Sequence, residues 1–103
     1  SGSGPAYCFL FLEALEQAAT EAGLEAATAR QLAIQTMAGA AKMAARGEDE
    51  PAQLKRNVMS PGGTTEKAIE AFEQGDFRGL VAKAFGAARK RSEELSQQLG
   101  SPS

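Results

Sequence analysis

Tyr7-Cys8-Phe9-Leu10-Phe11-Leu12 is the stretch of this 103-residue sequence that decides its fold. Six consecutive apolar or aromatic residues place hydrophobic side chains on every side of a helix, and such a helix is stable only when it is covered all round. A domain of this size buries only about 60% of the surface of its unfolded chain. A second copy of the chain is therefore expected to cover the other side of this helix, in an intimate homodimer.

The sequence on the C-terminal side of this stretch continues to favour helix. Alanine is abundant, and proline and β-branched residues are sparse, which is a composition with high helix propensity. Helices are expected from Pro5 to Gly23, from Ala26 to Arg46, from Pro51 to Val58, from Thr64 to Gln74, and from a cap at Asp76 to Gly100. No strand-like alternation occurs, so we expect an all-α fold of about five helices. Residues 5–100 would form one helical domain. Residues 1–4 would be a linker or the beginning of this domain, and residues 101–103 would be a tail.

The apolar positions of these segments predict which faces are buried. In the fourth segment the expected buried face is Ala68, Ile69 and Phe72. In the fifth, the residues expected to point inward are Phe77, Leu80, Val81, Ala84, Phe85 and Ala88. Cys8 is expected to be a buried small hydrophobe. Glu13, the charge inside the apolar helix, is expected to pair with a side chain of another helix.

Composition excludes several classes of function. Eleven basic and thirteen acidic residues give a net charge of −2, without the basic surplus of a nucleic-acid-binding protein. The absence of His excludes imidazole catalysis and His-ligated metal, and a single Cys excludes an internal disulfide and a multi-cysteine metal site. No apolar run approaches the roughly 20 residues that span a bilayer. We expect a soluble, cytoplasmic protein that binds neither metal, nucleic acid nor membrane.

The candidate binding site is Ser60-Pro61-Gly62-Gly63-Thr64-Thr65, between two predicted helices. Adjacent glycines permit a turn with close backbone approach, and the first N–H groups of the following helix have no partner inside that helix. Together with the helix dipole and the two threonine hydroxyls, these groups would suit a small carboxylate or phosphate. The same pattern is also typical of a plain helix–helix connection with an ordinary cap, and spacing alone favours that simpler interpretation.

Other motifs occur on both sides of this loop. They are Ser3-Gly4-Pro5-Ala6-Tyr7, the Phe-Leu-Phe-Leu-Glu-Ala-Leu run from Phe9, the Gln-Thr-Met-Ala-Gly-Ala-Ala-Lys-Met run from Gln35, Pro51-Ala52-Gln53-Leu54-Lys55 and Gly75-Asp76-Phe77-Arg78. In this order and at this spacing, with the loop between them, the sequence resembles the C-terminal domain of pyrroline-5-carboxylate reductases.

The resemblance implies an all-helical domain that interleaves with a partner in a homodimer, similar to the C-terminal domain of 6-phosphogluconate dehydrogenase. The resemblance leaves open whether such dimers assemble into higher oligomers. The implied reaction is reduction of 1-pyrroline-5-carboxylate to L-proline, the last step of proline biosynthesis, with NADPH or NADH held by an N-terminal Rossmann domain. This sequence has no Gly-x-Gly-x-x-Gly and no βαβ pattern. As a fragment it is therefore expected to bind no cofactor and to be inactive alone.

The resemblance also implies roles for individual residues. The substrate carboxylate would be held by backbone N–H and hydroxyl groups of Ser60, Gly62, Gly63, Thr64 and Thr65. Thr65 would lie near the ring nitrogen and orient it or help to protonate it. The residues that would shape the rest of the pocket are Glu48, Asn57 and Val58. The alternative is a free-standing helical homodimeric interaction module without a catalytic role.

Overall fold

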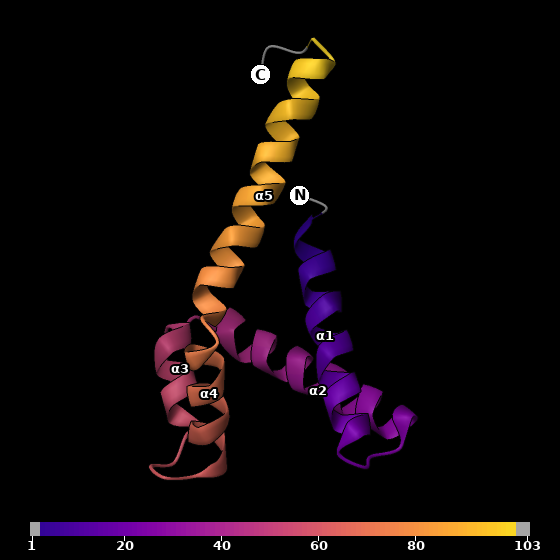
Figure 1. The fold of residues 1–103 in the computed structure, drawn as a ribbon. Coiled ribbons are helices and arrows are strands. Elements are labelled where there is room, and N and C mark those ends of the chain that lie inside the picture. Colours follow the sequence, from indigo (N-terminus) through magenta and orange to yellow (C-terminus); the bar gives the residue numbers. More distant parts are fainter. Residues whose placement is uncertain (1–2, 101–103) are drawn as a thin grey trace. The chain divides into compact units, whose positions relative to one another are not determined.

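The structure, a computed structural model, describes residues 3–100. Its helices are α1 (Ser3–Glu21), α2 (Ala26–Ala45), α3 (Pro51–Asn57), α4 (Thr64–Gln74) and α5 (Phe77–Gln98) (Figure 1). Residues 3–100 contain no strand. The predicted all-α fold is thus confirmed, and the helix bounds lie within a few residues of their predicted positions. The predicted tail, residues 101–103, lies outside the described residues.

The ends of the helices follow from local sequence. After α1, the Gly23 N–H donates to the Thr20 carbonyl at 3.0 Å and the Leu24 N–H donates to the Ala19 carbonyl at 3.1 Å. These two bonds are the paired closing bonds of a Schellman motif. At its other end α1 begins at Ser3, two residues before the predicted start at Pro5. Proline is tolerated there because N–H groups of the first turn have no acceptor inside the helix.

Internal contacts divide the chain into two compact units, Ser1–Lys55 and Arg56–Ser103, and each is described by itself. In the first unit α1 and α2 form a helical hairpin (Figure 1). Its packed centre consists of small side chains, since Ala29 is 1% exposed and Ala33 is 7% exposed. Side chains of this size allow α1 and α2 to approach closely, but they bury little apolar surface.

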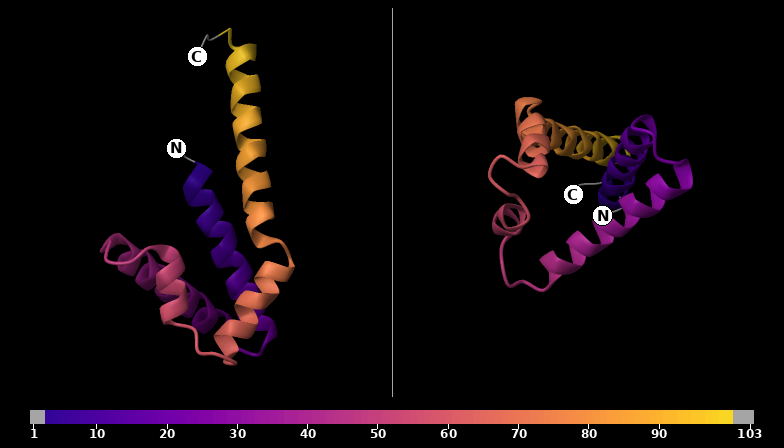
Figure 2. Two further views of the ribbon diagram at one scale, coloured as in Figure 1. Left: turned by 90° about the vertical axis from the view of Figure 1, so that its left-hand side faces the viewer. Right: turned by 90° about the horizontal axis from the view of Figure 1, so that it is seen from below.

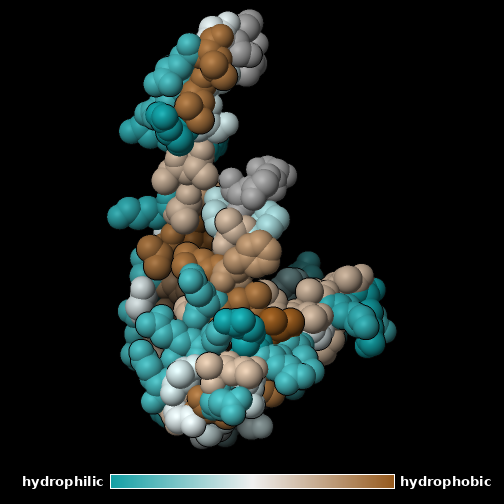
Figure 3. Space-filling model, turned by 90° about the vertical axis from the view of Figure 1, so that its right-hand side faces the viewer, coloured by the Kyte–Doolittle hydropathy of each residue, from teal (hydrophilic) through white to brown (hydrophobic). Residues whose placement is uncertain are grey.

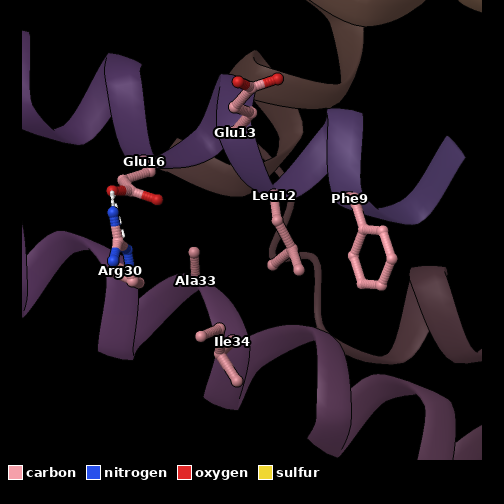
Figure 4. A pocket seen from close by; sticks show the side chains of 7 residues that line it. All are labelled: Phe9, Leu12, Glu13, Glu16, Arg30, Ala33 and Ile34. Atoms are coloured by element: carbon pink, nitrogen blue, oxygen red, sulfur yellow. Dashed lines mark hydrogen bonds and ion pairs between the residues drawn. The ribbon is translucent and has the colours of Figure 1, made fainter. Parts of the chain in front are cut away.

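The ion pair between α1 and α2 is not the predicted one. Arg30 of α2 pairs with Glu16 of α1 at 3.0 Å, whereas Glu13 is exposed and points away from α2 (Figure 4). The hydrogen bond and the charge of Glu16 raise the pKa of Arg30. Glu13 and Glu16 lie one helical turn apart, so the crossing of the two helices determines which of them meets the arginine.

In the second unit α4 and α5 meet at a corner (Figure 2). The rings of Phe72 and Phe77 pack edge to face across it, with centroids 5.4 Å apart. Arg78 donates three hydrogen bonds to the Glu73 carboxylate, two from Nε and one from Nη2, the shortest at 2.8 Å. Asp76 caps α5 as predicted, by accepting a hydrogen bond from the Gly79 N–H at 3.3 Å.

The predicted buried faces are largely uncovered in the single chain. Phe9 and Leu10 of α1 are each 66% exposed, and Leu80 of α5 is 63% exposed. Figure 3 shows hydrophobic side chains at the surface, including near the C-terminal end of α5. The other residues predicted to be buried on α4 and α5 are exposed or half-buried, and Cys8 is exposed. These predictions of burial are wrong for one chain taken alone, because isolated helices without a covering layer cannot enclose large side chains.

Candidate functional site

The loop between α3 and α4 is a well-defined β-turn. The Gly63 N–H donates to the Ser60 carbonyl at 2.9 Å, and Gly62 has a φ of 73°. Pro61 in the second position, positive φ in the third, and a hydrogen bond from the fourth residue to the first are typical of a type II turn. Gly62 is needed here because other residues rarely adopt this backbone conformation.

Gly63 is favoured at its position for a different reason. It is the N-cap of α4, with extended backbone angles, and a Cβ atom added to it would lie 3.0 Å from the Ser60 carbonyl oxygen and 3.3 Å from the Ser60 Cβ. Such contacts are tighter than most that real Cβ atoms make, so a side chain here would require Ser60 to shift by a few tenths of an ångström. The close approach predicted from the two glycines is therefore made within the loop itself.

Glu66 completes the loop and was missed by the sequence predictions. The Gly62 N–H donates to Glu66 Oε1 at 2.8 Å, so a side chain from the first turn of α4 reaches back across the turn. A Glu three residues after an N-cap is the spacing of a capping box, and this was the signal that could have identified it. Two of the backbone donors predicted to bind a ligand, those of Gly62 and Gly63, are thus engaged inside the loop.

The donors that remain lie at the start of α4. The first N–H that bonds back to the N-cap is that of Lys67, which donates to the Gly63 carbonyl at 3.3 Å. Within residues 3–100, the N–H groups and hydroxyls of Thr64 and Thr65 have no hydrogen-bond acceptor. Both threonines are exposed. Two unpaired amides and two hydroxyls at the positive end of a helix dipole can bind a small carboxylate.

The remaining predicted pocket residues are placed differently. Asn57 ends α3, and Val58, which is 62% exposed, follows it directly, so both lie in the same unit as the turn. Glu48 is exposed and belongs to the first unit, in the segment between α2 and α3. The structure thus brings together the loop with Asn57 and Val58, and describes Glu48 separately from it.

Two open grooves lie in the first unit, between α1 and α2. The smaller, of about 210 Å³, has an apolar floor and the Glu16–Arg30 pair at one end (Figure 4). Its lining residues are Phe9, Leu12, Glu13, Glu16, Arg30, Ala33 and Ile34. The larger, of about 580 Å³, runs along the neighbouring polar side of α1. Neither groove includes the loop.

The described part of the chain, residues 3–100, contains neither a metal-binding group of side chains nor a helix that could span a membrane. No three His, Cys, Asp or Glu side chains in this range are grouped so that they could hold a metal ion. None of the helices in the same range combines the length and the apolar character needed to cross a membrane.

Comparison with known proteins extends to nearly the whole chain. Residues 1–95 match the family described as pyrroline-5-carboxylate reductase dimerisation. A pyrroline-5-carboxylate reductase of Pseudomonas aeruginosa is 52% identical over 100 residues, which are 97% of this chain and 37% of the relative. The chain thus spans little more than a third of the length of this relative.

Two solved structures are similar in fold as well as in sequence. A pyrroline-5-carboxylate reductase from Coxiella burnetii has a TM-score of 0.89 and 53% identity, covering 92% of this chain and 35% of the other. A Plasmodium falciparum pyrroline carboxylate reductase, solved with NADP bound, has a TM-score of 0.88 and 36% identity, covering 91% of this chain and 36% of the other. On the family match over residues 1–95 and these similarities, the chain belongs to the pyrroline-5-carboxylate reductase dimerisation family.

Proposed function

We propose that this chain supplies the dimer interface and the substrate carboxylate site of an NAD(P)H-dependent pyrroline-5-carboxylate reductase. The observation that carries the proposal is the family match over residues 1–95, strengthened by 52% identity to a reductase across 97% of the chain. The reaction would convert 1-pyrroline-5-carboxylate to L-proline.

The dimer would cover the apolar faces that one chain leaves open. Phe9 and Leu10 on α1 and Leu80 on α5 expose most of their side-chain surface. Each side chain of this size stabilises a protein by about 1.5–3 kcal/mol when it is fully buried. We propose that helices of a second copy pack on these faces in an interleaved arrangement, which would remove them from water.

The substrate carboxylate would bind at the start of α4. The unpaired N–H groups and hydroxyls of Thr64 and Thr65, with the hydroxyl of Ser60 beside the turn, offer a cluster of donors for one anionic group. The type II turn before the helix, closed by the hydrogen bond from the Gly63 N–H to the Ser60 carbonyl, would hold these donors in a fixed arrangement. Asn57 and Val58, which precede the turn, would line the same pocket, and Glu48 stays a further proposed pocket residue.

The chemical step would require one hydride and one proton. The nicotinamide transfers its hydride to the carbon of the substrate C=N bond, the π electrons of that bond move to nitrogen, and a proton completes the secondary amine. The relative from Plasmodium falciparum has NADP bound, which supports a nicotinamide cofactor here. A dinucleotide-binding Rossmann fold requires a parallel β-sheet, and residues 3–100 consist of helices and loops without a strand. We therefore propose that residues outside this range hold the cofactor.

Thr65 would orient the ring nitrogen. Its hydroxyl can donate a hydrogen bond to the nitrogen or pass a proton toward it while the carboxylate is held by the neighbouring donors. Fixing both ends of a small substrate keeps its reactive carbon in one position relative to the hydride donor. The role is therefore one of positioning and protonation at a single atom.

The test uses a reductase polypeptide that carries this sequence as its dimerisation region. Thr65→Ala is expected to lower kcat/KM for 1-pyrroline-5-carboxylate by about a hundredfold, in the range of a lost acid–base or orienting group. Thr65→Ser, which keeps the hydroxyl, is the matched control and should retain most activity. Light scattering should show the same dimer for all three proteins. Wild-type turnover in Thr65→Ala would contradict the role of Thr65, and a wild-type polypeptide without imine reductase activity would favour a non-catalytic helical module.

A further inference from the structure

Glu66 contacts the loop but has no part in the substrate binding or the chemical step proposed above. It lies on the first turn of α4, is half-buried, and accepts the Gly62 N–H at 2.8 Å. We propose that Glu66 is a positioning residue for the substrate loop: it holds the Gly62 N–H, fixes the turn, and so keeps the donors of Thr64 and Thr65 together for a carboxylate ligand. The inference rests on the proposed function of this loop.

The turn needs such support because of its composition. Two adjacent glycines lose more conformational freedom on ordering than any other pair of residues. In the structure two hydrogen bonds restrain them: Gly63 N–H to the Ser60 carbonyl at 2.9 Å, and Gly62 N–H to Glu66 Oε1 at 2.8 Å. The first closes the turn on itself, whereas the second ties the turn to α4. Without Glu66 the turn would lose its hydrogen bond to the helix that carries both threonines.

A carboxylate beside an anion site could also act as a competitor that occupies the site when no ligand is bound. The hydrogen-bond pattern favours a supporting role instead. Glu66 takes the donor of Gly62, which precedes the N-cap, and leaves the amides and hydroxyls of Thr64 and Thr65 without an acceptor in residues 3–100. A stand-in for the ligand would take the donors at the helix start. Glu66 and the ligand therefore use different donors.

The two roles predict opposite effects of substitution. Glu66→Ala removes the acceptor, whereas Glu66→Gln removes the charge and keeps a side-chain oxygen that can accept from Gly62. A supporting residue is needed as an acceptor, so Glu66→Ala should weaken substrate binding and Glu66→Gln should not. A competitor acts through its charge, so both substitutions would strengthen binding. Glu70→Ala is the matched control, because Glu70 lies on the same helix with only an i,i+3 pair to Lys67 at 3.6 Å.

The first measurement is independent of reductase activity. Amide hydrogen exchange of the 103-residue chain, followed by NMR, reports directly on the Gly62 N–H. Exchange at Gly62 is expected to be about three- to tenfold faster in Glu66→Ala than in wild type, the range for one lost hydrogen bond. Glu66→Gln and Glu70→Ala should exchange as wild type does. Equal exchange in all four proteins would overturn the proposal, because the bond to Glu66 would then not exist in solution.

The second measurement is steady-state kinetics in the reductase polypeptide. Glu66→Ala is expected to raise KM for 1-pyrroline-5-carboxylate about three- to tenfold with kcat changed less than about twofold, since loop order and not chemistry is lost. A lower KM in both Glu66→Ala and Glu66→Gln would overturn the proposal in favour of the competitor, and an unchanged KM would exclude any role in binding. Failure of the proposed function is seen separately, as absence of wild-type turnover or full activity of Thr65→Ala.

Discussion

Asp76 shows how a single residue determines the corner between α4 and α5. Its backbone is left-handed, with φ 56° and ψ 46°, a conformation that costs most residues about 1–2 kcal/mol. Asp is tolerated because its short carboxylate bonds locally, here to the Gly79 N–H at 3.3 Å. A Cβ atom on Gly79 would overlap that carboxylate. The two positions therefore depend on each other.

This dependence predicts a change of sign in a double-mutant cycle. Gly79→Ala alone should lower the free energy of unfolding by up to about 1 kcal/mol, because the displaced capping carboxylate costs about 1–2 kcal/mol and the higher helix propensity of Ala offsets only part of that loss. In an Asp76→Gly background the carboxylate is gone, and the same substitution should stabilise by about 0.5–1 kcal/mol through helix propensity. Urea unfolding of the four proteins at one protein concentration measures both values. An equal loss in the two backgrounds would show that Gly79 is required for a reason other than Asp76.

At the scale of elements, α5 is a long helix with an exposed apolar stripe. Leu80, Val81 and Phe85 recur at helical spacing and are all exposed in the single chain. Past Arg89 the helix is highly charged and carries an Arg91–Glu94 pair at 3.3 Å. An amphipathic helix of this kind is stabilised mainly by packing of its apolar face, not by helix propensity. We propose that a second copy of the chain covers this stripe, and the match to a dimerisation family supports this proposal.

The apolar stripe of α5 can be tested with matched charge changes. Leu80→Glu is expected to dissociate the dimer or weaken it at least about tenfold, because a charge buried without a partner is strongly unfavourable. Arg89→Gln changes the net charge by the same amount, nine residues further along α5 and so on the opposite side, and should leave the dimer intact. Light scattering over a range of concentrations distinguishes the two. A Leu80→Glu protein that dimerises like wild type would show that this part of α5 stays exposed.

At the scale of the whole molecule, one chain has almost no core. Ala29 and Ala33 are the buried hydrophobic residues among those the structure describes, and neither carries a large side chain. Folded domains derive most of their stability from buried apolar surface. Folding and association of this chain are therefore expected to be coupled, with unfolding transitions that depend on protein concentration.

Cys8 provides a chemical probe of this coupling. It is the only thiol of the chain, it lies in the all-apolar helix, and it is exposed when the chain is alone. In a dimer that covers α1, its reaction with a thiol reagent should be at least about tenfold slower than in urea, since opening of the native state would limit access. The rate should rise as the protein is diluted and dimers dissociate. A native rate equal to the unfolded rate, with light scattering showing a monomer, would contradict the dimer.

The sequence by itself determined the helices, their ends and the position of the loop, because propensity, capping and glycine turns act over a few neighbouring residues. Tyr7-Cys8-Phe9-Leu10-Phe11-Leu12 also predicted the need for a partner, which the exposed face of α1 and the family match support. Only the tertiary structure decided which groups meet. In the structure Arg30 forms its ion pair with Glu16 and not with Glu13, and the Gly62 N–H donates a hydrogen bond to the Glu66 carboxylate. How two helices cross does not follow from spacing along the chain. The spacing of Glu66 after the N-cap indicates a capping residue, but the direction of the turn decides that Glu66 accepts from the Gly62 N–H and not from that of Gly63.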